Sequence, residues 1–79
     1  MKVQILRLLT KITEADSVTI KHELASRGLP LDIHALRMAL MRYHKQGILR
    51  RERSGVRFLY GITEKGRQRL RWLDSQIGE

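Results

Sequence analysis

The basic side chains are the residues of this sequence whose chemistry is most evident. The chain holds sixteen Lys and Arg residues against eight Asp and Glu residues, a formal net charge of +8, and eleven of the sixteen are arginines. Residues 37–71 contain eleven basic and two acidic residues, a net charge of +9, whereas residues 1–36 contain five basic and four acidic residues, a net charge of +1. Guanidinium groups form paired hydrogen bonds with phosphate and with guanine. The charge therefore predicts a polyanionic partner, either nucleic acid or an anionic membrane surface.

Patterns that would support catalysis or metal binding are not evident. The histidines His22, His34 and His44 lie twelve and ten positions apart, and the sequence has no cysteine. This spacing does not match a zinc site. The sequence also has no serine in a nucleophile elbow and no glycine-rich phosphate loop. We therefore expect no enzyme activity, no metal and no cofactor.

The length of 79 residues corresponds to a single domain, residues 1–79, with a small core. Apolar residues alternate with charged ones along the whole basic segment, which indicates a folded surface rather than a disordered tail. No stretch is apolar enough to span a membrane, and the N-terminus lacks the apolar run of a signal peptide. We expect a cytoplasmic protein.

Apolar periodicity predicts four helices and one hairpin, a mainly α fold with a small β-hairpin (α+β). Helical spacing of three and four positions is clearest in residues 1–13 and 32–46, and a spacing of two appears after Gly47. The predicted helices span residues 1–13, 19–27, 32–46 and 63–77, and the predicted hairpin spans residues 48–62.

Polar residues and glycines mark the ends of these elements. Thr19, Asp32 and Thr63 are the predicted N-caps of the second, third and fourth helices, because their side-chain oxygens accept hydrogen bonds from early helical N–H groups. Gly28 and Gly47 are predicted to end the second and third helices, because glycine adopts the left-handed conformation at low cost.

The hairpin turn is predicted at Ser54-Gly55. A two-residue turn there places Arg53 opposite Val56 and Leu49 opposite Tyr60. One face of the hairpin should then cover the core, and that face carries Leu49, Phe58, Tyr60 and Ile62.

The order and spacing of three local patterns resemble the winged helix-turn-helix of transcriptional regulators. Residues 19–25 look like the first helix of the helix-turn-helix, and Leu36, Leu40 and Tyr43 leading into residues 47–49 look like the end of a recognition helix. Residues 60–66, Tyr-Gly-Ile-Thr-Glu-Lys-Gly, resemble the passage from the second wing strand into the last helix in the PadR-like and MarR-like groups.

This resemblance implies binding to double-stranded DNA, with residues 32–46 in the major groove and the wing on the backbone or minor groove. The N-terminal part of a recognition helix enters deepest, so we expect His34, Arg37, Met38 and Met41 to contact bases. Met41 is expected to be more exposed than Met38. Arg42 and Lys45 are expected to contact phosphate. The remaining expected DNA-binding residues are Thr19, Lys21, Arg51, Arg53, Ser54 and Arg57.

Surplus apolar residues on the terminal helices predict a homodimer. Val3 and Leu6 lie off the main apolar stripe of the first helix, and Trp72 lies off that of the last. These positions either bury within the chain or contact a second subunit, and a chain this small favours the second arrangement. The predicted dimer interface consists of Val3, Leu6, Trp72, Leu73 and Ile77.

Two other functions remain open. Winged helices also serve as protein-interaction modules in transcription or RNA assemblies, and a basic domain can bind nucleic acid without sequence preference. The +9 charge on residues 37–71 favours DNA binding, because an interaction module does not need it. We expect a nucleoid-associated regulator with no small-molecule effector, because the chain ends soon after the wing, with no room for the extra helices that would form a ligand pocket.

Overall fold

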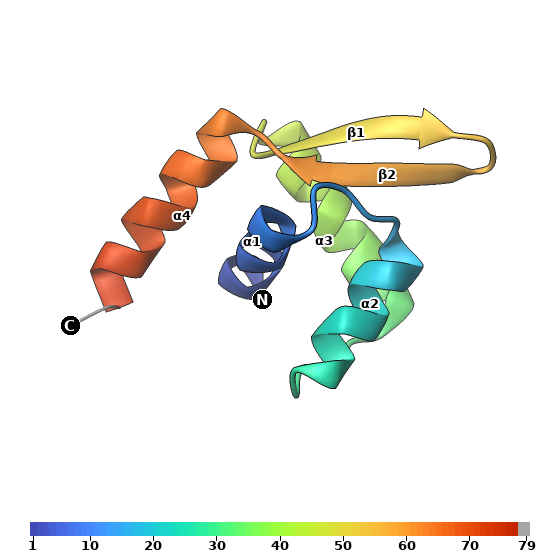
Figure 1. The fold of residues 1–79 in the computed structure, drawn as a ribbon, viewed down its shortest axis with the longest axis horizontal. Coiled ribbons are helices and arrows are strands. Elements are labelled where there is room, and N and C mark those ends of the chain that lie inside the picture. Colours follow the sequence, from blue (N-terminus) through green and yellow to red (C-terminus); the bar gives the residue numbers. More distant parts are fainter. Residues whose placement is uncertain (78–79) are drawn as a thin grey trace.

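The computed structural model describes residues 1–77 and contains the predicted order of elements (Figure 1). A two-stranded antiparallel hairpin lies along one side of four helices, so the fold is α+β as predicted. The elements are α1 (Lys2–Lys11), α2 (Ser17–Ser26), α3 (Ile33–Lys45), β1 (Leu49–Ser54), β2 (Arg57–Ile62) and α4 (Glu64–Ile77).

Helix α1 is the centre of the core. Ile5, Leu8 and Leu9 are buried, as their helical spacing predicts. Leu6 is also fully buried, so the expectation that it adds exposed apolar surface is wrong. The physical reason is that α1 packs against α2, β2 and α4, so more than one of its faces is covered by its own chain.

Helix α2 begins two residues earlier than predicted. Its N-cap is Asp16, whose carboxylate accepts a hydrogen bond from the Thr19 N–H at 2.8 Å, so the prediction of Thr19 as the N-cap is wrong. Thr19 lies inside the first turn and is exposed. A carboxylate suits the N-terminus of a helix well, because it accepts a hydrogen bond and also carries the charge that the helix dipole favours.

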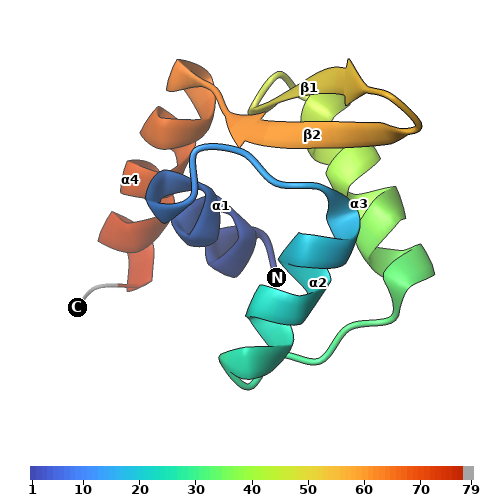
Figure 2. The same cartoon turned by 45° about the vertical axis from the view of Figure 1, so that its right-hand side comes forward.

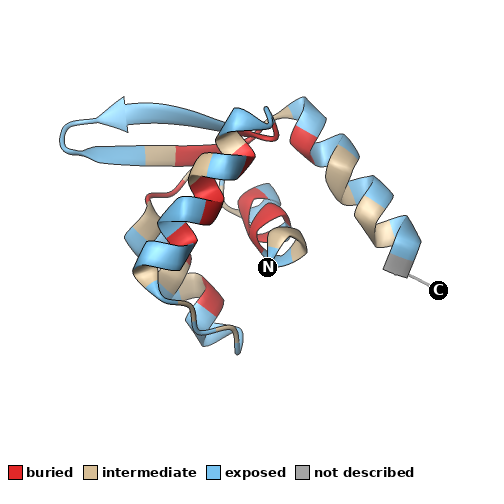
Figure 3. Ribbon diagram, turned by 180° about the vertical axis from the view of Figure 1, so that it is seen from behind, coloured by how far each residue is buried: buried red, intermediate tan, exposed pale blue. Residues whose placement is uncertain are grey.

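Helix α3 has the predicted ends. The Asp32 carboxylate accepts a hydrogen bond from the Ala35 N–H at 3.0 Å, and Gly47 follows the helix with a φ of +80°. Leu36, Leu40 and Tyr43 are buried, which turns the opposite face of α3 outward (Figure 3).

The hairpin register differs from the prediction. Ser54 pairs with Arg57 and Leu49 pairs with Ile62, so the turn consists of Gly55 and Val56 rather than Ser54 and Gly55. Gly55 has a φ of +65°, and a glycine with positive φ at the first central position is typical of a hairpin turn. The pairing therefore shifts by two residues, which keeps every side chain on the predicted face.

The predicted inner face of the hairpin covers the core only near its base. Leu49, Tyr60 and Ile62 are buried, but Phe58 is 41% exposed, so the expectation that Phe58 covers the core is wrong. Phe58 lies nearer the turn than Tyr60 and Ile62, and it lines a cleft beside the hairpin instead of covering the core.

The loop between α1 and α2 joins the hairpin as a short third strand. Ala15 and Tyr60 exchange two backbone hydrogen bonds, at 3.0 and 2.8 Å, along the free edge of β2. The start of α2 is thereby fixed beside the hairpin.

Helix α4 packs beside α1 (Figure 2). Thr63 is its N-cap as predicted, because the Thr63 hydroxyl accepts a hydrogen bond from the Gly66 N–H at 3.0 Å. Leu70 and Leu73 pack against the core while remaining half-buried. The side chain of Ile77 lies outside the described part of the structure.

Gly66 allows the first turn of α4 to approach the backbone closely. A Cβ atom at this position would lie 2.1 Å from the Ile48 carbonyl oxygen and 2.8 Å from Cγ1 of Ile62. We predict that Gly66→Ala lowers the free energy of unfolding by about 2–3 kcal/mol, because α4 must move away from the core. Chemical denaturation measures this change. Gln68→Ala, at an exposed position of α4, is the control and should stay within about 0.5 kcal/mol of wild type. Equal stabilities of the two variants would contradict the close packing.

Candidate nucleic-acid interface

The outward face of α3 carries the side chains that the sequence assigns to base contact. This face lies opposite the buried Leu36 and Leu40. Its successive turns carry His34, Met38, Met41 and Lys45. His34 and Lys45 are exposed. Met38 is 42% exposed whereas Met41 is half-buried, so the expectation that Met41 is the more exposed methionine is wrong. Met41 is partly covered because it lies toward the hairpin, where it lines a cleft.

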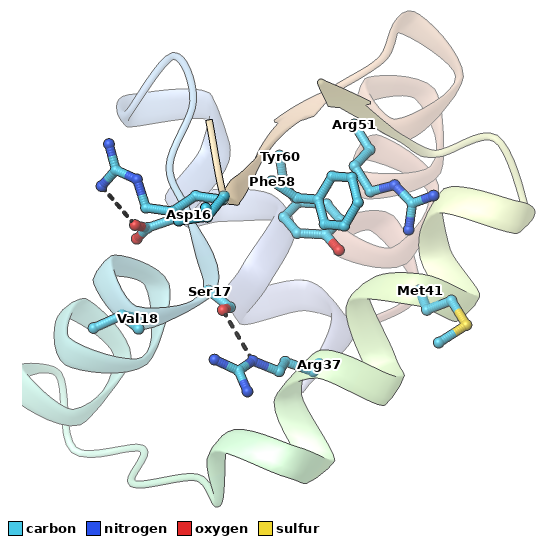
Figure 4. Close-up of a pocket in the computed structure, with 10 residues that line it drawn as sticks. Asp16, Ser17, Val18, Arg37, Met41, Arg51, Phe58 and Tyr60 are labelled. Atoms are coloured by element: carbon cyan, nitrogen blue, oxygen red, sulfur yellow. Dashed lines mark hydrogen bonds and ion pairs between the residues drawn. The ribbon is translucent and has the colours of Figure 1, made fainter. Parts of the chain in front are cut away.

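Arg37 lies at the edge of this face. Its side chain is exposed as predicted, but it points toward the start of α2, where its Nε donates a hydrogen bond to the Ser17 hydroxyl at 3.3 Å (Figure 4). Ser17 thus orients the guanidinium group through Nε, and the two terminal nitrogens keep their donors for another partner.

The hairpin carries arginines on both faces. Arg51 lies on the same face as Phe58, with its guanidinium carbon 4.4 Å from the centre of the Phe58 ring, a cation–π contact. Arg53 donates a hydrogen bond from Nε to the Gly55 carbonyl at 3.1 Å. Arg50 points to the other side, where it pairs with Glu14 at 3.1 Å. Arg51 and Arg53 therefore contribute positive charge on the side that faces α3.

Arg57 joins the hairpin to the start of α2. Its Nη1 lies 2.9 Å from Oδ2 of Asp16, whose side chain is 10% exposed. The hydrogen bonds from Thr19 lower the pKa of Asp16 below its usual value, and the Arg57 guanidinium adds to this effect. The same carboxylate therefore caps α2 and holds β2 against it.

These residues surround a cleft of about 340 Å³ between α2, α3 and the hairpin (Figure 4). Its lining combines three cationic groups, from Arg37, Arg51 and Arg57, with apolar groups from Val18 and Phe58. Four residues of this surface were not predicted from the sequence: Asp16, Ser17, Val18 and Phe58. Spacing could have indicated Asp16, because it precedes Thr19 by three positions, the separation of an N-cap and its N–H donor.

Thr19, Lys21, Arg42 and Ser54, also predicted to bind DNA, do not line this cleft. Thr19, Arg42 and Ser54 are exposed, and Lys21 is half-buried on α2. Ser54 stands directly before the turn, opposite Arg57. Of the predicted DNA-binding residues, the structure brings together at the cleft Arg37, Met41, Arg51 and Arg57.

Of the predicted dimer residues, Trp72 is the most exposed, at 57%. Val3 and Leu73 are half-buried. Within residues 1–77, no group of three or more His, Cys, Asp or Glu side chains is placed to hold a metal ion. The described helices also include none that is long and apolar enough to cross a membrane.

Comparison with solved structures identifies the fold. A PadR family transcriptional regulator from Eggerthella lenta DSM 2243 superimposes with a TM-score of 0.79 at 24% identity, over 94% of this chain and 70% of that one. The complex of hsRosR-S1 superimposes with a TM-score of 0.76 at 20% identity, over 95% of this chain and 71% of that one. Bacillus subtilis PadR in complex with operator DNA gives a TM-score of 0.73 at 23% identity, over 91% of this chain and 44% of that one.

The chain thus has the winged helix fold of PadR-family regulators, with the β1–β2 hairpin as its wing. It spans less than half the length of the Bacillus subtilis protein. No protein-family model matches the sequence, and no curated protein matches it.

We predict that Asp16→Asn makes the stability less dependent on pH. Asn caps helices about as well as Asp, so the variant keeps the cap and loses the charge that pairs with Arg57. Because folding lowers the pKa of Asp16, its charged form stabilises the protein above the unfolded value of about 3.9, and this contribution disappears as the pH falls through the lowered value. The free energy of unfolding of the wild type should exceed that of the variant by about 1 kcal/mol at pH 7. Near pH 2 the two free energies should be equal.

Denaturant titrations of both proteins between pH 7 and pH 2 measure this difference. Asp32→Asn is the matched control, because Asp32 is also a helix cap but is exposed. A wild-type advantage that stays constant over this pH range would show that the Asp16 charge does not stabilise the fold.

Proposed function

We propose that this chain binds double-stranded DNA as a transcriptional regulator. The observation that carries the proposal is the cleft between α2, α3 and the hairpin, where cationic side chains from α3 and the hairpin converge beside the outward face of α3. The segregated charge, +9 on residues 37–71, supports it. The shared fold with Bacillus subtilis PadR, which was solved with operator DNA, supports the same function. Such a regulator works where the DNA lies, in the cytoplasm with the nucleoid.

The cleft fits one strand of the duplex backbone. With α3 in the major groove and the hairpin at the adjoining minor groove, the phosphate strand between the two grooves crosses the cleft. Arg51 and Arg57 would then neutralise phosphates, and the Phe58 ring would pack against deoxyribose. A site for phosphate alone would not require the apolar side chains, whereas a sugar–phosphate backbone uses both kinds of contact.

The outward face of α3 supplies the groups that reach the bases. His34, Met38 and Met41 lie along its centre, and Met38 can contact the methyl group of thymine. Arg37 reaches bases only with its terminal nitrogens, because its Nε is bonded to Ser17. Arg42 and Lys45 follow later in the helix, where phosphate is the nearer partner.

The proposed regulator is a homodimer that associates through α1 and α4. Trp72 is 57% exposed on α4, and the half-buried Val3 and Leu73 add apolar area. A tryptophan exposed to this degree is typical of an interface. A twofold axis through this face would present two α3 helices to successive major grooves, about 34–36 Å apart along the DNA.

Binding to duplex DNA tests the proposed function. We expect a duplex selected from a random pool to bind more tightly than a scrambled duplex, with an affinity that falls steeply between 50 and 200 mM salt. Equal binding of both duplexes would indicate a non-specific nucleic-acid-binding protein. The absence of binding at either salt concentration would leave the interaction-module function.

Arg37→Ala should reduce sequence preference. We expect a loss of about 1–3 kcal/mol on the selected duplex and a smaller loss on the scrambled one, because the Arg37 fork holds guanine only at the preferred site. Arg37→Lys should retain binding to the scrambled duplex and lose part of the preference. Fluorescence anisotropy titrations measure both. A loss of equal size on the two duplexes would assign Arg37 to the phosphate backbone.

Trp72→Ala should weaken the dimer at least tenfold, because a large apolar side chain leaves the interface (about 1.4 kcal/mol or more). Sedimentation equilibrium at tens of micromolar measures the association. Val18→Ala removes another exposed apolar side chain, on α2, and should leave the association unchanged. A monomeric wild type would contradict the dimer, and unchanged association of Trp72→Ala would exclude Trp72 from its interface.

A further inference from the structure

Val56 occupies the tip of the hairpin and contributes almost nothing to the fold. It is 97% exposed, the highest value among the large apolar side chains of the described residues. The turn requires a glycine with positive φ at position 55 only, and Val56 does not adopt a positive φ. Polar residues such as Ser, Asn and Asp are more common in such turns. Folding therefore does not explain an isopropyl group at this position.

The protein restrains the arginines on either side of Val56. Arg57 is paired with Asp16 at 2.9 Å, which draws its guanidinium group toward α2, and Arg53 is bonded to the Gly55 carbonyl of the turn at 3.1 Å. The isopropyl group of Val56 is the exposed apolar group at the end of the wing, where it also lines the cleft. The wing projects past the helices (Figure 1).

The proposed DNA complex brings this tip to the minor groove. When α3 lies in the major groove and the backbone crosses the cleft, the hairpin extends over the next groove, which is about 6 Å wide and 7.5 Å deep in B-DNA. A two-residue turn with one short side chain is narrow enough to enter it. The cations beside the tip are attracted by the phosphates on both sides of this groove, whatever the base sequence.

On the floor of the minor groove, A·T and G·C base pairs differ by one group, the 2-amino group of guanine, and an apolar side chain cannot form a hydrogen bond with it. Both A·T orientations present acceptors alone, whereas G·C adds the guanine 2-amino group, which projects into the groove and needs an acceptor. The Val56 side chain offers no acceptor and would take water away from that donor. An unpaired donor at an interface is costly, so G·C is disfavoured.

We propose that Val56 is a specificity-determining residue, which makes the chain prefer A·T over G·C base pairs in the minor groove beside the segment that α3 contacts. This inference rests on the proposed function and refines it. The charges of the wing supply affinity for any sequence, and its apolar tip supplies the discrimination.

Base analogues test the proposal without changing the major groove. Three duplexes share the selected site and differ in the flanking base pairs, which are A·T, G·C or inosine·C. Inosine·C has the major-groove hydrogen-bonding groups of G·C but lacks the 2-amino group. Wild type should bind the G·C duplex about tenfold more weakly than the A·T duplex. Its affinity for the inosine·C duplex should lie within about twofold of its affinity for the A·T duplex. Fluorescence anisotropy at one fixed salt concentration measures all three.

Val56→Thr is the matching variant, because threonine has nearly the same volume and its hydroxyl can accept a hydrogen bond from the 2-amino group. We expect the ratio of its affinities for the A·T and G·C duplexes to fall to about threefold or less. Thermal unfolding should be unchanged, because position 56 is exposed. Arg53→Ala is the contrasting variant, which should weaken binding to all three duplexes by a similar factor and lower the salt slope by about one unit.

The results separate this inference from the proposed function. If wild type binds the selected duplex but does not distinguish G·C from inosine·C flanks, the role of Val56 is overturned while DNA binding stands. If Val56→Thr keeps the wild-type ratio of affinities for the A·T and G·C duplexes, the role of Val56 is also overturned, because the discrimination would then come from another residue. If no duplex is bound, the proposed function itself fails.

Discussion

The Asp16 carboxylate connects two of the elements on which the candidate interface depends, α2 and β2. It accepts the Thr19 N–H that starts α2, and it pairs with Arg57 of β2, which lies 41 positions away in the sequence. The neighbouring Ala15 is joined to Tyr60 by two backbone hydrogen bonds. The distance between the start of α2 and the hairpin is therefore fixed by short polar contacts. Because the cleft lies between these elements, its width depends on the same contacts.

The interface keeps its positive charges oriented before any partner arrives. Arg37 is bonded to Ser17, Arg51 stacks on Phe58, Arg53 is bonded to Gly55 and Arg57 is paired with Asp16. A long side chain that is already restrained loses less conformational entropy when it binds a phosphate. The pairing of Arg57 with Asp16 instead opposes phosphate binding, because a phosphate must compete with the Asp16 carboxylate for the Arg57 guanidinium group. In the proposed complex, phosphate contacts through Arg57 would therefore be weaker than its exposure alone suggests. The observed role of Arg57 is to pair with Asp16 and hold the hairpin beside α2.

The sequence predicted the elements well because each is defined by local periodicity or by a local cap. The stripe of Leu36, Leu40 and Tyr43 and the caps at Asp32 and Thr63 required no knowledge of distant contacts, and all are confirmed. The N-cap of α2 was harder, because Asp16 and Thr19 are both good capping residues. The three-residue spacing from Asp16 to Thr19 is compatible with a cap at Asp16 but does not exclude one at Thr19. The bridge from Ala15 to Tyr60 and the pairing of Asp16 with Arg57 favour Asp16, and both are contacts between distant segments.

The remaining differences also come from contacts between distant segments. Leu6 is buried because three other elements cover α1, and an apolar stripe cannot show how many neighbours a helix has. Phe58 is exposed because it lies nearer the turn than Tyr60 and Ile62, the residues of β2 that reach the core. The orientation of Arg37 toward Ser17 depends on how α2 packs against α3. The sequence therefore could not show how these side chains are held in place, because their partners lie in other elements.

The central claim is that α2, α3 and the hairpin form one DNA-binding surface. Titration of the isotope-labelled chain with its selected duplex, followed by amide chemical shifts, tests this claim most directly. The account predicts the largest changes at the start of α2, along α3 and at residues 50–58 of the hairpin, with small changes in the middle of α1. Changes concentrated on α1 and α4, with the cleft residues unaffected, would contradict it.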